Sequence, residues 1–232
     1  MIMILAAALA AAAPAASIDA ACPDVVTPEA FVCRALDASK AGRSEAAATA
    51  FEQAALATDD KDPGKFRMLA AAGNMWIAAG QPGKAALALD RALAGSALQA
   101  EQRGEALLDR ARAAEAQNDL KTARARLNEA AQTISEDPFY WYFSAALAIR
   151  ELDKSTAQNS INRALSLAPT DPTVLFEAGH VAHFVGDQAK ARDYWTRAAA
   201  ADPAGSIGKA ARAALALPPA PVTPKTPAAK AQ

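Results

Sequence analysis

Small and apolar residues recur at helical spacing along most of this chain, in pairs of segments separated by short polar turns. In the clearest pair, the first helix would bury a face with intervals of three and four residues, made of Leu175, Ala178, Gly179 and Ala182. After a turn at Gly186, the second helix would present a matching face, made of Ala191, Trp195 and Ala198. Small residues let two helix backbones approach closely, and large residues fill the space beside them. The pattern therefore predicts a packed helix-turn-helix unit.

This unit is repeated along the chain. One copy has its large, small and proline positions at Trp141, Ala145, Ala157, Ile161, Ala164 and Pro169. The next copy has them at Leu175, Gly179, Ala191, Trp195, Ala198 and Pro203. Each position of the second set lies 34 residues after its counterpart in the first. Three weaker copies precede these two, and the turns inside the five units fall at positions 42, 80, 118, 152 and 186.

The intervals between these turns are 38, 38, 34 and 34 residues. Two connections should therefore be longer than the others, and we place the extra residues within 59–63 and 94–100. The fourth turn carries Leu152 at a position where a turn of this kind favours glycine.

Two helices in 34 residues, with large and small positions in this order and a closing proline, resemble the tetratricopeptide repeat. The resemblance covers about residues 31–203 and is strongest in the last two units. It implies an all-α fold, a right-handed α-solenoid of about five helix-turn-helix repeats. A final helix over residues 205–217 would cap the exposed apolar face of the stack.

The chain divides into four parts on this interpretation. Residues 1–16 contain no charged side chain and end in small residues, as a secretory signal peptide does, although the usual basic residue near the start is missing. Residues 17–30 form a lead segment, 31–217 the repeat domain, and 218–232 a disordered tail rich in proline and alanine. A buried or frayed N-terminal helix and a retained anchor are the alternatives for residues 1–16. The favoured interpretation places the protein in the periplasm or otherwise outside the cytoplasm, with no stable membrane span in the mature chain.

Cys22 and Cys33 are the only cysteines. In an exported protein they can form a disulfide, which would fasten the lead segment to the first helix. The alternative is two free thiols, with Cys33 half-buried as a small apolar residue.

Composition removes several classes of function. Hydrophobic residues make up 52% of the 232 residues but aromatic residues only 6%, and much of the excess is alanine, the best helix former. The net charge of −1 lacks the basic excess of a nucleic-acid-binding protein. The sequence contains no phosphate-binding loop, dinucleotide-binding glycine motif, nucleophile elbow or zinc-protease motif. We therefore expect no enzyme activity and no cofactor.

An unusual run of five aromatic residues spans positions 139–143. A helix cannot turn all five inward, because consecutive side chains are about 100° apart. By resemblance to tetratricopeptide domains, Phe139, Tyr142, Phe143 and Arg150 should lie towards the concave surface. The last repeat would contribute Phe176, Glu177, His180, His183 and Phe184 there. The alternative is that the last repeat or the terminal helix covers the aromatic residues.

The resemblance adds Asn74, at a position where many such domains hold an asparagine that contacts a bound peptide, and Arg112 on the same face. The candidate partner-binding residues are Asn74, Arg112, Tyr142, Phe143, Arg150, Phe176, His180 and Phe184. The leading hypothesis is an exported scaffold that binds another protein or a peptide segment on its concave surface. Its alternatives are a self-associating structural protein and, with less support, a metal- or ligand-binding module that uses His180 and His183.

Overall fold

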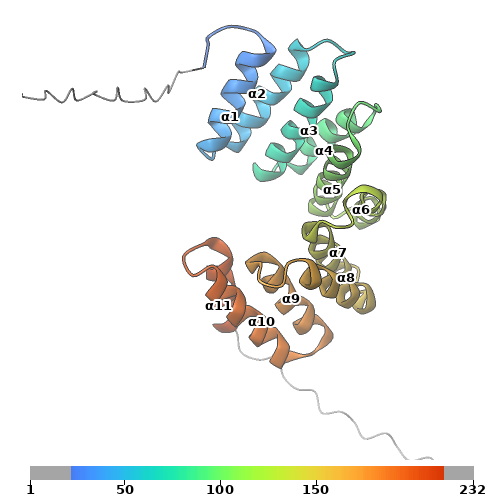
Figure 1. Ribbon diagram of the computed structural model, residues 1–232, viewed down its shortest axis with the longest axis vertical. Coiled ribbons are helices and arrows are strands. Elements are labelled where there is room, and N and C mark those ends of the chain that lie inside the picture. The colour runs from blue at the N-terminus through green and yellow to red at the C-terminus, as the bar shows by residue number, and fades with distance from the viewer. Residues whose placement is uncertain (1–21, 217–232) are drawn as a thin grey trace, which may run out of the picture.

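A computed structural model describes residues 22–216, which form an open stack of eleven helices. Figure 1 shows the helices following one another in chain order along an arc. They are α1 (Pro28–Lys40), α2 (Ser44–Ala57), α3 (Pro63–Ala78), α4 (Pro82–Leu93), α5 (Ala100–Ala116), α6 (Leu120–Ile134), α7 (Pro138–Arg150), α8 (Lys154–Leu167), α9 (Pro172–Val185), α10 (Gln188–Ala201) and α11 (Ser206–Ala216). Consecutive helices pair as five helix-turn-helix units, and α11 packs on α10 at the end. The predicted all-α solenoid of five repeats and a capping helix is confirmed.

The five predicted turn positions are the places where the backbone adopts positive φ. Gly42, Gly80 and Gly186 have φ of 69°, 68° and 99°, while Asn118 and Leu152 have φ of 62° and 61°. Glycine adopts this conformation freely and asparagine tolerates it, but leucine does so at a cost. The turn position therefore holds its backbone geometry even where its residue type is unfavourable.

The first helices of the repeats start at a recurring cap. Asp62, Asp137 and Asp171 each precede a proline at the first helical position, and each carboxylate accepts a hydrogen bond from a backbone N–H of the first turn. An aspartate at the cap satisfies an unpaired N–H, and proline lacks the N–H that would otherwise be unpaired. The two longer connections are residues 58–62 and 94–99, close to the predicted segments.

Within a repeat, glycine allows one helix to receive a large side chain from its partner. A Cβ added at Gly73 would lie 2.4 Å from Leu89 Cγ, and one added at Gly179 would lie 2.2 Å from Trp195 Nε1. Alanines fill most of the remaining interface at nearly zero exposure. The helices thus pack closely over a thin core.

The curvature follows from which helices touch across repeats. Besides consecutive helices, the described contacts join α3 to α5, α7 to α9 and α9 to α11, whereas even-numbered helices within residues 22–216 make at most slight contact with one another. The odd-numbered helices therefore form the shorter, inner layer of the arc. We call their solvent-facing side the inner face.

One junction in the stack is thinner than the others. The backbones of α5 and α7 approach each other at few points at most, and α6 approaches α7 at fewer points than any other pair of consecutive helices within residues 22–216. Large side chains of α7, among them Tyr140, Phe143 and Leu147, fill the space between these more widely separated backbones of the third and fourth repeats.

The chain ends lie partly outside this description. The predicted signal peptide, residues 1–16, and the predicted tail, residues 218–232, are outside the described residues. Helix α1 begins at Pro28, inside the segment taken as a lead, and Cys22 and Cys33 form a disulfide that ties residues before α1 to the helix itself. Among residues 22–216, no helix combines the length and apolar character needed to cross a membrane.

Candidate partner-binding surface on the inner face

The aromatic run of α7 divides between the core and the inner face. Tyr140 is buried, and Trp141 is half-buried with its indole N–H donating to the carbonyl of Ser135 at 2.6 Å. Phe139 is 47% exposed and meets the ring of Tyr142 edge-on, with 5.5 Å between ring centroids. Phe143 is half-buried against the core formed by α5 and α6. The structure therefore leaves Phe139 and Tyr142 as the aromatic part of the inner face.

Tyr142 lies among charged groups that several inner helices and their caps contribute. Its pKa is raised by burial first, with an opposing effect from Arg112 on α5 and smaller increases from Glu177 on α9 and from Asp171 and Asp137. These groups come from three successive inner helices and their caps. They surround the phenol with three carboxylates and one guanidinium.

Asn74 and Arg112, both candidate contact residues, converge on one carboxylate. The amide of Asn74 donates to Oδ2 of Asp109 at 2.8 Å, and the guanidinium of Arg112 donates to Oδ1 of the same residue at 2.8 Å. Asp109 thereby links α3 to α5 across two repeats. From the sequence we named Asn74 and Arg112 but missed Asp109. The local sequence pattern does not distinguish Asp109 from other carboxylates on helix surfaces.

Arg150 forms a second link between repeats. Its guanidinium donates to the backbone carbonyl of Glu115 at 3.0 Å and to Oδ1 of Asn118 at 2.7 Å, and it forms an ion pair with the Glu115 carboxylate. The side chain is therefore held at the turn between α5 and α6. It acts there as a brace between the third and fourth repeats.

The candidates on α9 form a cluster around Trp195. The ring of His180 lies 4.5 Å from Phe176 and 5.5 Å from Trp195, both in edge-to-face arrangements. The indole N–H of Trp195 donates to the carbonyl of Phe176 at 3.2 Å. Phe184, further along α9, has the ammonium of Lys154 5.6 Å from its ring centroid. These side chains are half-buried, so they combine a packing role with partial access to the inner face.

Glu177 is the most perturbed acid of the described chain. Burial raises its pKa to about 7. None of the ion pairs within residues 22–216 involves it. A carboxylate held in this way is partly protonated near neutral pH. Strongly shifted acids are enriched at functional sites, so Glu177 joins the candidate residues.

Three further carboxylates gather beside the aromatic pair. Glu101 and Glu105 on α5 and Asp137 before α7 line a hollow of about 360 Å³ with the end of α6. The pKa of Glu105 is raised, first by burial and then by the charges of Glu101, Asp109 and Asp137. Glu105 also lines a neighbouring hollow of about 230 Å³ between α3 and α5, together with Arg67 and Asn74.

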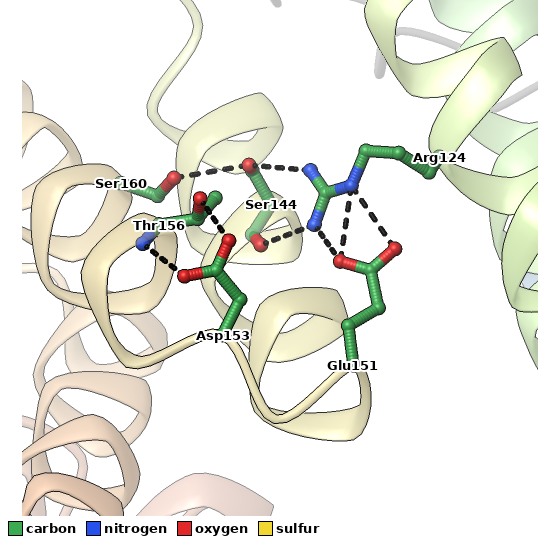
Figure 2. A network of polar contacts seen from close by, with 6 residues as sticks. All are labelled: Arg124, Ser144, Glu151, Asp153, Thr156 and Ser160. Carbon is green, nitrogen blue, oxygen red and sulfur yellow. Dashed lines mark hydrogen bonds and ion pairs between the residues drawn. The ribbon is translucent and has the colours of Figure 1, made fainter.

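A polar network holds the thin junction between the third and fourth repeats, as Figure 2 shows. Arg124 of α6 donates to the carboxylate of Glu151 at 3.1 Å and to the hydroxyl of Ser144 at 3.1 Å. The hydroxyls of Ser144 and Ser160 lie 3.0 Å apart in a buried hydrogen bond. Asp153 caps α8 by accepting from the backbone N–H of Thr156 at 3.0 Å. Arg124 thus ties α6 to α7 and to the residue after it, and the serine pair ties α7 to α8.

The geometry gives no support to a metal site at His180 and His183. Within residues 22–216, only Cys22, Cys33 and Asp37 bring three ligand atoms close enough to share an ion, and both sulfurs are joined in the disulfide. His183 instead places Nδ1 3.0 Å from Oε1 of Gln188.

Comparison with known proteins places the chain by its fold. No family profile matches the sequence, and no curated protein matches it. Among solved structures, 45 chains match. TTC0263, a tetratricopeptide repeat protein of Thermus thermophilus, is 19% identical with a TM-score of 0.63, and the match covers 82% of this chain and 100% of that chain.

Two further structures are similar. PilW, described as a type IV pilus biogenesis factor, is 16% identical with a TM-score of 0.65, covering 79% of this chain and 81% of that chain. YrrB, described as a tetratricopeptide repeat protein with an unusual peptide-binding site, is 15% identical with a TM-score of 0.55, covering 79% and 91%. These likenesses establish the tetratricopeptide-type fold that the repeat pattern predicted.

Proposed function

We propose that this protein is a scaffold that binds a segment of a partner polypeptide on its inner face. The observation that carries the proposal is the aromatic pair on the inner face, in which Phe139 is 47% exposed and Tyr142 is half-buried beside it. Tyr142 packs partly on the core of α7 to α9, whereas Phe139 leaves nearly half of its surface to solvent, and exposed apolar patches commonly mark interaction sites. The peptide-binding site described for YrrB supports the proposal, because that protein has a similar fold.

The eight sequence candidates take different parts in this proposal. Tyr142, Phe176, His180 and Phe184 offer partly exposed rings to a bound segment, whereas Phe143 packs against the core of α5 and α6. Asn74 and Arg150 hold neighbouring repeats together through their hydrogen bonds, and Arg112 orients Asp109, the partner of Asn74, from within α5. They therefore set the shape of the surface. Phe139 and Glu177 complete the set of contact candidates.

Export to the periplasm or another extracytoplasmic compartment is part of the same proposal. The uncharged N-terminal stretch and the Cys22–Cys33 disulfide support it, because disulfides persist mainly in oxidising compartments. Fusion of residues 1–30 to a reporter enzyme that is active only outside the cytoplasm tests this point. An inactive fusion that accumulates inside the cell would contradict export.

Site-specific photo-crosslinking tests the binding function directly. A photoreactive phenylalanine analogue replaces Phe139 in the full chain, expressed in its native cells. The matched control places the same analogue at Leu87, which is 69% exposed on α4 in the outer layer. Both positions are accessible, so they differ in the face that they probe.

Adducts with a distinct protein at position 139, but not at position 87, are the expected result. Adducts at position 87 alone would move the interaction to the outer face and refute the proposal. An adduct with the mass of two copies of this chain would instead favour the self-associating alternative.

A further inference from the structure

We infer that the inner face between α5 and α9 selects a partner segment that carries Lys or Arg next to an apolar residue. This inference rests on the proposed function and adds the chemistry of the partner to it. The cation would enter the hollow beside Glu101 and Glu105, and the apolar residue would pack on Phe139 and Tyr142.

The charge distribution of the surface points to a cationic partner. Glu101, Glu105 and Asp137 take part in none of the ion pairs formed within residues 22–216. The nearby guanidinium of Arg112 is already paired with Asp109 at 2.8 Å, which leaves Arg67 as the cation that lines the adjoining hollow. Like charges held close together repel one another, and an incoming ammonium or guanidinium relieves that repulsion.

The apolar part of the surface is continuous with this acidic part. Asp137 and Phe139 are two residues apart at the start of α7, and Phe139 contacts Tyr142 along the same helix. On the far side, the charge of Glu177 also acts on Tyr142. A cation placed beside these aromatic rings gains from their negative faces as well as from the carboxylates. The combination distinguishes a basic apolar segment from a purely apolar one and from an acidic one.

Selection from a random peptide display library reveals such a preference even while the natural partner is unidentified. The full folded chain serves as the immobilised target, and enriched peptides are sequenced. A synthetic version of the most enriched peptide is then measured by fluorescence polarisation. We expect enrichment of Lys or Arg adjacent to aromatic or aliphatic residues. We also expect the affinity to fall as the salt concentration rises.

The decisive variant is Glu101→Gln with Glu105→Gln, which removes two charges and preserves shape. Asp137 is left intact because it caps α7. The expected loss of affinity is about fivefold to tenfold, as for two partly screened ion pairs. Glu129→Gln is the matched control, because Glu129 pairs with Arg126 on exposed α6 and lines neither hollow.

Each outcome decides a different point. Enriched peptides without basic residues, or equal affinity for the double variant and the wild type, would overturn the inference and leave the binding function standing. Absence of any enrichment would count against both. Enrichment that occurs only after Lys225→Gln and Lys230→Gln would show that the chain's own basic residues occupy the surface, which would overturn the assignment to a separate partner.

Discussion

Glu177 makes the stability of the stack depend on pH, and Glu177→Gln is the change that exposes this dependence. Burial on α9 raises the pKa of the folded-state carboxyl from an ordinary value of 4.5 to about 7. In the unfolded chain the same group has its ordinary pKa. Between these two values the folded protein binds the proton more tightly, so stability falls as the pH rises from about 4.5 to about 7.

The size of the effect follows from the difference between the two pKa values. Each pKa unit corresponds to about 1.4 kcal/mol, so a carboxyl shifted from 4.5 to about 7 costs the folded state about 3 kcal/mol once it is ionised. This is an upper value, because the side chain is only partly enclosed. Glutamine resembles the protonated acid in shape and never ionises.

Urea denaturation followed by circular dichroism measures the prediction at several pH values. At about pH 8 the Glu177→Gln variant should be more stable than the wild type by up to about 3 kcal/mol, and at about pH 4 the two should agree. The slope of each transition must also agree between the two proteins, because a solenoid can unfold in more than one step.

His180 makes stability change with pH in the opposite direction, so its contribution has to be separated from that of Glu177. Burial, followed by the charge of His183, lowers the pKa of His180 below 6.5. The unfolded state therefore gains the proton first as the pH falls through 6.5, and stability decreases there. Comparison of variant with wild type at each pH cancels this contribution. A stability difference that is equal at about pH 4 and pH 8, or a wild type that is more stable at pH 8, would refute the reasoning.

Three substitutions test the packing of the stack, each by urea denaturation against the wild type. Leu152→Gly should stabilise by about 0.5–1 kcal/mol, because Leu152 is 78% exposed with positive φ; destabilisation would mean that its side chain has a packing role. Gly179→Ala should cost about 2 kcal/mol, because its Cβ would press on Trp195, and an unchanged midpoint would contradict this close approach. Arg124→Gln should cost about 2 kcal/mol, because Arg124 and Glu151 are each 23% exposed and interact across α6 and α7; a loss below about 0.5 kcal/mol would show that solvent replaces the contact.

The repeat pattern was sufficient to predict the helix pairs and their turns. Large and small residues at fixed spacing report the packing inside a repeat, and that packing is local in sequence. The predicted turn at Leu152 was correct although its residue type was unfavourable, because the spacing of the neighbouring repeats determined it. The starts of the first helices were also readable in principle, since an Asp-Pro pair marks three of them at positions 62, 137 and 171.

The candidate surface was less predictable, because it depends on contacts between repeats. Asn74 and Arg112 were predicted to lie on the same face, but their common partner Asp109 depends on the register between α3 and α5. No local pattern encodes that register. The raised pKa of Glu177 likewise comes from its burial in the folded stack and could not be inferred from its position on α9 alone.

The thin junction between the third and fourth repeats gives the arc unequal stiffness along its length. We expect the two halves of the arc to swing about the junction of α6 and α7 more than about any other, because neighbouring backbones approach each other at the fewest points there. The contacts of Arg124 with Glu151 and Ser144 restrict that motion. A ligand that contacts both halves reduces their bending when it binds, and this loss of entropy lowers its affinity. The loss is smaller when the contacts of Arg124 already restrict the bending, so the affinity should be higher with these contacts intact.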